Sequence, residues 1–143
     1  MQVPEIIAPL AAGSKFDRDE LTVDVARENL LAALRALKGG GWERLGDVTA
    51  VDRHPSEPRF EIIYHLASVS MKQRLRLKVR LSGDAAEVES ATQVYRSANW
   101  YEREVFDLFG VKFLNHPDMR RIMMPDEWEG HPLRKDYPVE GYK

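Results

Sequence analysis

The chain has 143 residues, 43% of them hydrophobic and 31% charged, and this length fits one domain with a real core. Its formal net charge of -2 provides no long-range attraction to nucleic acid or anionic membranes, and the absence of cysteine excludes disulfide scaffolds, thiolate zinc sites and ordinary cysteine-ligated iron–sulfur clusters. The longest stretch without a formal charge, residues 62–71, is too short to span a membrane, and residues 1–15 lack a secretory signal, which indicates a cytoplasmic-type compartment.

The N-terminal third predicts an arm, a strand and a helix. Residues 1–19 show no periodicity, so we expect a poorly ordered or partner-dependent arm. Residues 20–25 alternate apolar and polar side chains, as a half-buried strand does. One helical face then carries Leu30, Leu31, Leu34 and Leu37. Three glycines at 39–41 end this helix, because glycine adopts the left-handed conformation without a side-chain clash.

The middle of the chain predicts a sheet. Residues 59–66 and 74–81 alternate in the same way, and a hairpin through Ala67–Gln73 joins them. Residues 47–52 and 90–95 are weaker strand candidates. The second strong strand carries a basic stripe that must face water or acidic groups: Arg74, Arg76, Lys78 and Arg80.

A second helix is predicted to begin near Asn99, with Asn99 as its cap and Glu102 as the capping-box partner, and to end before Gly110. Glu102 lies at the edge of the apolar stripe, so it is either a capping group or a hydrogen-bonded buried carboxylate. On the polar face, Arg103 and Asp107 either meet a partner or pair with each other across one helical turn.

This order of elements predicts an α+β fold, with two helices on one face of a largely antiparallel sheet. We expect an N-terminal arm at 1–19, the α+β domain at 20–113 and an extended tail at 114–143. The tail is interrupted by Pro117, Pro125, Pro132 and Pro138, which prevent a long helix. Its many apolar residues indicate that it lies against another surface.

Two stretches carry a family signature. Residues 97–121 read SANWYEREVFDLFGVKFLNHPDMRR, and residues 125–138 read PDEWEGHPLRKDYP. Both resemble the C-subunit family of NADH-quinone oxidoreductase, the respiratory complex I. The resemblance extends over about residues 21–138, which is nearly the whole chain.

The resemblance implies a structural component of the peripheral arm, held between the D and B subunits of a hetero-oligomer. It implies no cofactor in this chain, since NADH, FMN, the iron–sulfur clusters and quinone are bound by partner subunits. Membrane association is expected only through the complex, on the cytoplasmic side of the inner membrane or its organellar equivalent. No nucleic acid is expected as a partner.

We expect the partner interface on the polar face of the second helix and along the tail. The candidate residues are Arg103, Glu104, Asp107, His116, Pro117, Arg120, Arg121, Trp128, His131, Arg134, Lys135 and Tyr137. We expect no catalytic or metal-binding residues, because Glu102 and Glu104 diverge on a helix and the four histidines lack a helical metal-binding spacing.

Two other functions stay open. The nearer one is the equivalent component of a membrane-bound hydrogenase or of a ferredoxin-fed complex, because such complexes share the signature. The remoter one is a nucleic-acid-binding module that uses the basic stripe. The exposed positions of that strand carry no aromatic residue for base stacking, which disfavours this second function.

Overall fold

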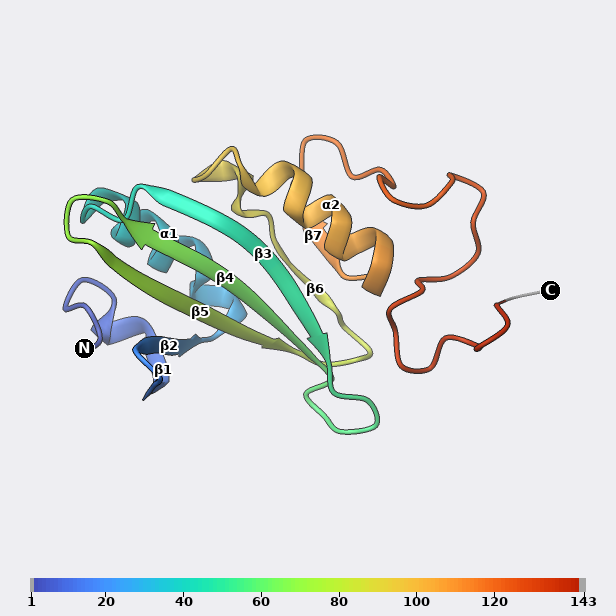
Figure 1. Cartoon of the computed structure of the whole chain (residues 1–143), viewed down its shortest axis with the longest axis horizontal. Coiled ribbons are helices and arrows are strands. Elements are labelled where there is room, and N and C mark those ends of the chain that lie inside the picture. Colours follow the sequence, from blue (N-terminus) through green and yellow to red (C-terminus); the bar gives the residue numbers. More distant parts are fainter. Residues whose placement is uncertain (1, 142–143) are drawn as a thin grey trace.

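The computed structural model describes residues 2–141 (Figure 1). The strands in this range are β1 (Ala11–Asp17), β2 (Glu20–Val25), β3 (Arg44–Asp52), β4 (Phe60–Ser68), β5 (Gln73–Leu81), β6 (Glu87–Glu89) and β7 (Lys112–Leu114). The helices are α1 (Leu30–Gly39) and α2 (Ala98–Phe109), with short 3-10 turns η1 (Ala8–Leu10), η2 (Arg27–Asn29) and η3 (Ala91–Gln93).

The main sheet has the strand order β1-β2-β5-β4-β3. Its strand pairs are antiparallel except for β2 and β5, which run parallel. A small second sheet pairs β6 with β7 in parallel. The predicted α+β class and the largely antiparallel sheet are therefore confirmed.

One face of the main sheet forms the core together with the helices. The strands β4 and β5 bury every second residue, as predicted: Phe60, Ile62, Tyr64, Leu66, Leu75, Leu77, Val79 and Leu81. From α1, Leu30, Leu34 and Leu37 are completely buried against this face. Burial of each such side chain contributes on the order of 1.5–3 kcal/mol before entropy is counted, so helix and sheet stabilise one another.

The structure corrects the expected N-terminal arm. Residues 11–17 form β1, which pairs antiparallel with β2 through a tight turn at Arg18 and Asp19. Just before β1, Ile7 is completely buried. The residues of β1 are mostly exposed on both faces, so its backbone pairing with β2 holds it and no side-chain alternation could reveal it.

Two further expectations were wrong. Residues 90–95 form no strand, because Ser90 caps η3 instead and the strand in this region is the earlier β6. Asn99 is not a cap, since α2 begins at Ala98 and Ser97 precedes it without a side-chain capping bond. Gly110 does end α2, in the left-handed conformation with a φ of 78°.

The C-terminal tail, defined here as residues 115–141, begins one residue later than expected because Leu114 belongs to β7. It contains no helix or strand in the described range. It runs past α2 (Figure 1) and comes back to the end of the main sheet, where Lys135 and Asp136 bond to Asp52 and Arg59. No helix in the described part of the chain is both long and apolar enough to cross a bilayer.

Candidate partner interface

The tail begins at a buried histidine. The His116 side chain is fully enclosed; Asp118 N–H donates to its Nδ1 at 2.9 Å, and its Nε2 lies 3.1 Å from the Asn99 carbonyl oxygen. Because Nδ1 accepts a hydrogen bond, the proton of the neutral ring resides on Nε2 and is donated to Asn99. Burial lowers the pKa of His116, which favours this neutral form.

Asp107 on α2 fixes the middle of the tail. Its Oδ2 accepts the backbone N–H groups of Ile122, Met123 and Met124, at 3.1, 2.6 and 2.8 Å. Its Oδ1 accepts Arg121 Nη1 at 2.6 Å. Burial alone would raise the pKa of Asp107, but these hydrogen bonds outweigh burial and lower it. The carboxylate therefore stays charged and holds four donors of the tail.

Two more side chains extend this contact between α2 and the tail. Arg121 Nη2 donates to the Gly130 carbonyl at 2.8 Å, so it bridges two parts of the tail. His131 Nδ1 lies 2.8 Å from the Asp107 carbonyl oxygen, and Leu133 N–H donates to the Leu108 carbonyl at 2.9 Å. These bonds satisfy carbonyls of the last turn of α2 that have no partner within the helix.

An ion-pair cluster secures the end of the tail. Arg59 donates to both carboxylate oxygens of Asp52 at 2.8 and 2.9 Å, and to both oxygens of Asp136 at 3.2 and 2.9 Å. Lys135 N–H adds a bond of 2.8 Å to Asp52. Hydrogen bonding to Arg59 lowers the pKa of Asp136 to about 2. For Asp52, the bonds to Arg59 and to backbone N–H groups outweigh burial and lower its pKa as well.

The expected ion-pair surface of Arg103 and Asp107 is not what the structure shows. Both side chains are buried within the chain, and Arg103 donates to the carbonyls of Arg120 and Arg121 at 3.1 and 3.4 Å. These residues direct the course of the tail. Glu104, the residue after Arg103, is exposed and has no ion pair among residues 2–141.

Several large apolar side chains are exposed on the tail and on the adjoining face of α2. The side chains exposed over α2 and the tail include Trp100 (60%), Met123 (61%), Trp128 (41%) and Leu133 (53%). Among the other candidate residues, Pro117 and Lys135 are also exposed, Arg120 pairs with Asp118, Arg134 pairs with Asp136, and Tyr137 Oη accepts the Trp128 indole N–H at 3.1 Å. Polar bonds thus hold the tail inward while its large apolar side chains remain uncovered.

Three of these apolar residues, Trp100, Met123 and Leu133, were absent from the predicted interface. The Trp100 ring lies beneath the Arg103 guanidinium, with 4.7 Å between the guanidinium carbon and the ring centroid. The number of apolar residues in the tail indicates that some of them contact a partner. In an irregular segment, however, no periodicity tells which side chains, such as Met123 and Leu133, point outward.

Glu102 is a completely buried carboxylate, which confirms one of its two expected roles. Ser90 Oγ donates to it at 2.6 Å and Ala91 N–H at 2.7 Å. Burial raises the pKa of Glu102 to about 7, against the opposing effect of these bonds. Burial, and then the charge of Glu102, also raise the pKa of Tyr64.

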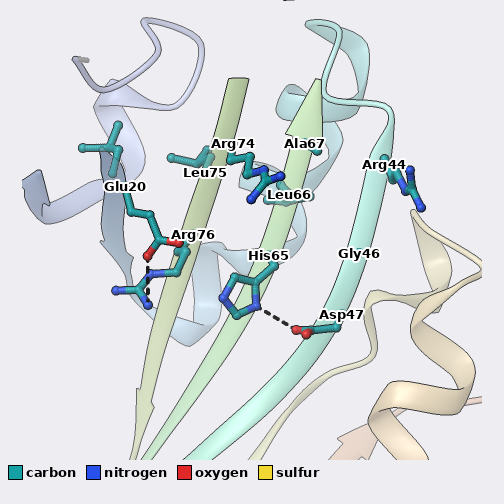
Figure 2. A pocket seen from close by; sticks show the side chains of 11 residues that line it. Glu20, Arg44, Gly46, Asp47, His65, Leu66, Ala67, Arg74, Leu75 and Arg76 are labelled. Atoms are coloured by element: carbon teal, nitrogen blue, oxygen red, sulfur yellow. Dashed lines mark hydrogen bonds and ion pairs between the residues drawn. The ribbon is translucent and has the colours of Figure 1, made fainter. Parts of the chain in front are cut away.

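The opposite face of the sheet carries the basic stripe, where Figure 2 shows Glu20 pointing toward Arg76 and His65 toward Asp47. Lys78 and Arg80 both meet Glu61, at 3.2 and 3.6 Å. Most of the stripe is therefore neutralised by carboxylates, which weakens the nucleic-acid alternative.

The described residues contain no group of three His, Asp or Glu side chains that could hold a metal ion.

Comparison with known protein families identifies the family of the chain. A family described as "Respiratory-chain NADH dehydrogenase, 30 Kd subunit" matches residues 23–143 of the chain. The chain belongs to this family. The matched range includes α2 and the tail, which the structure joins through Asp107 and Arg121.

Curated relatives in this family are similar over most of their length. The C subunit of NADH-quinone oxidoreductase from Citrifermentans bemidjiense is 48% identical over 87% of this chain and 78% of its own. The protein of the same name from Trichlorobacter lovleyi is 52% identical over 89% of this chain and 80% of its own. Since the family is that of one component of an enzyme complex, the chain is part of a hetero-oligomer.

Two solved structures share the fold of this NADH dehydrogenase family. The trypsin-resistant fragment of Nqo5 has a TM-score of 0.73 and 28% identity, covering 80% of this chain and 93% of the fragment. A chain of a membrane-bound sulfane sulfur reductase, an archaeal respiratory membrane complex, has a TM-score of 0.82 and 30% identity, covering 94% of this chain and 82% of that chain.

Proposed function

We propose that this chain is the C subunit of a proton-translocating NADH-quinone oxidoreductase and acts as a structural part of its peripheral arm. It docks on the D and B subunits and carries no redox cofactor of its own. It reaches the cytoplasmic face of the inner membrane only through the complex. The observation that carries this proposal is the row of exposed apolar side chains on a tail that polar bonds already hold in place.

The docking surface consists of the outward face of α2 and the tail. Exposed tryptophan and methionine side chains are characteristic of interface centres, and Trp100, Met123 and Trp128 supply them here. Permanent interfaces bury more than about 2,000 Å² and are apolar at their centre. An extended tail suits this purpose because it offers a long contact line for few residues.

A structural role fits the chemistry of the chain. The sequence has no cysteine, so the usual thiolate ligands of an iron–sulfur cluster are missing. Asp52 and Asp136, whose pKa values are lowered the most, are engaged with Arg59 in fixing the tail. Electron transfer is therefore assigned to the partner subunits.

A second candidate is the equivalent component of a related respiratory membrane complex. The similarity to the sulfane sulfur reductase chain, with 30% identity, supports this second candidate. Relatives near 50% identity carry the name of the NADH-quinone enzyme, which gives that assignment greater support.

Affinity purification of the tagged full chain from native membranes, followed by mass spectrometry, separates these functions. The proposal expects the B and D subunits together with the NADH-oxidising subunits. Recovery of the catalytic component of a sulfane reductase or hydrogenase instead would support the second candidate. A chain recovered alone from native extract would contradict both.

A further inference from the structure

One edge of the main sheet is open. The strand order ends at β3, whose only partner strand among the described residues is β4. In an edge strand, every second residue turns its N–H and C=O groups away from its single neighbour. At the start of β3, Ser97 Oγ donates to the Leu45 carbonyl at 3.0 Å. Within residues 2–141, no further hydrogen bond from outside the sheet reaches the backbone of residues 47–51.

A groove of about 390 Å³ runs along this open edge, between β3 and α2. Four consecutive strand residues, 47–50, line one side of it, so it follows the edge of the strand rather than one face. Buried Val48 and Val105 and half-buried Phe109 contribute apolar surface. Figure 1 shows α2 lying beside β3 over this length.

The groove has a negative rim. Glu104 of α2 lines it, is exposed and lacks an ion pair among the described residues. Asp47 lines it as well, although His65 already pairs with it at 2.7 Å. A cationic side chain entering the groove would therefore find its counter-charge at Glu104.

The groove is continuous with the tail surface. Leu133, one of the exposed apolar residues of the tail, forms part of its lining. A partner that covers the tail is thus brought directly to the open edge of β3.

We propose that residues 47–50 of β3 accept an extended segment of a partner subunit as an additional strand, with a Lys or Arg of that segment paired to Glu104. The inference rests on the proposed function, because the segment belongs to the partner that covers the tail. Only an extended segment satisfies the outward N–H and C=O groups of β3, and its alternate side chains enter the apolar groove. A docked helix would leave these backbone groups unpaired.

Hydrogen exchange of individual backbone amides tests the strand pairing. The full chain is measured alone and within the purified complex, with the doubly paired amides of β4 as the internal reference. We expect alternate amides in residues 47–51 to exchange about tenfold or more slowly in the complex. Equal exchange in both states would overturn the inference. Protection that grows with concentration in the isolated chain would assign the edge to a second copy and also overturn it.

Charge reversal tests the contact with Glu104. Glu104→Lys should weaken association with the partner about tenfold or more, and Glu104→Gln by less. Asp84→Lys is the matched control, because Asp84 is an exposed carboxylate outside β3, α2 and the tail, and it should bind normally. Wild-type binding by Glu104→Lys would contradict the pairing. A chain that fails to co-purify with any partner would instead contradict the proposed function, so the two failures are distinguishable.

Discussion

Arg59 and Asp136 lie 77 positions apart in the sequence, yet their side chains meet in an ion pair with 2.9 Å between Nη2 and Oδ1. Through this contact the residue just before β4 holds the far end of the tail. Asp52 receives the same guanidinium from the end of β3, so one buried cation joins two strands to the tail.

Loss of this cation should destabilise the chain markedly. In Arg59→Gln, the buried Asp52 loses its counter-charge, and the free energy of unfolding should fall by about 3 kcal/mol or more. Urea denaturation of the full chain measures this change. The control is Arg120→Gln, since Arg120 pairs with Asp118 on the surface and should give no measurable change. Equal stabilities of the two variants would contradict the role given to Arg59.

Replacing Asp107 should release the middle of the tail. Asp107→Asn removes the charge from a group that accepts three backbone N–H donors, and the expected loss is about 2–3 kcal/mol. Hydrogen exchange should speed up at the amides of residues 122–124 while the amides of β4 and β5 keep their protection. Unchanged exchange at 122–124 would show that Asp107 does not hold the tail.

Glu102 should make stability fall as pH rises. The folded chain keeps the Glu102 proton up to a pKa of about 7, whereas the unfolded chain releases it near 4.5. Between these pH values the unfolded state binds fewer protons, so the free energy of unfolding decreases with rising pH, by an amount on the order of 2–3 kcal/mol. Glu102→Gln should lose this decrease when urea denaturation is compared at about pH 5 and about pH 8. The same decrease in the variant would refute the assignment.

His116 should be neutral in the folded chain, with its proton on Nε2. The bond from Asp118 N–H to Nδ1 leaves no room for a proton there. Nitrogen chemical shifts of the imidazole at neutral pH report the tautomer directly. A protonated Nδ1 would mean that the start of the tail takes a different course.

The sequence was informative where burial alternates. Leu75, Leu77 and Val79 reveal β5 because one face of that strand is in the core and the other meets water. The strand β1 escaped detection because pairing with β2, rather than burial, holds it. Periodicity and capping patterns describe residues within one helix or strand. They do not predict contacts between residues that are far apart in the sequence.

Asp107 illustrates this limit most clearly. On a helix, its charge and spacing indicate a pair with Arg103 or a partner. The structure instead gives it donors that lie 14 to 17 positions later in an irregular segment. No periodicity connects Asp107 with these donors. The stretch 97–121 that resembles the family contains Asp107 and Arg121, so it located the region without revealing the contact.

In the proposed complex, the exposed apolar residues of the tail bind a partner subunit. Calorimetric titration of the full chain with the purified D subunit tests this binding most directly, comparing the wild type with a variant carrying Met123→Ser, Trp128→Ser and Leu133→Ser. A matched variant carries Phe16→Ser, Val69→Ser and Met71→Ser, which removes exposed apolar side chains from the opposite end of the domain. We predict about hundredfold weaker binding for the tail variant and unchanged binding for the control. Wild-type affinity in the tail variant would contradict the account.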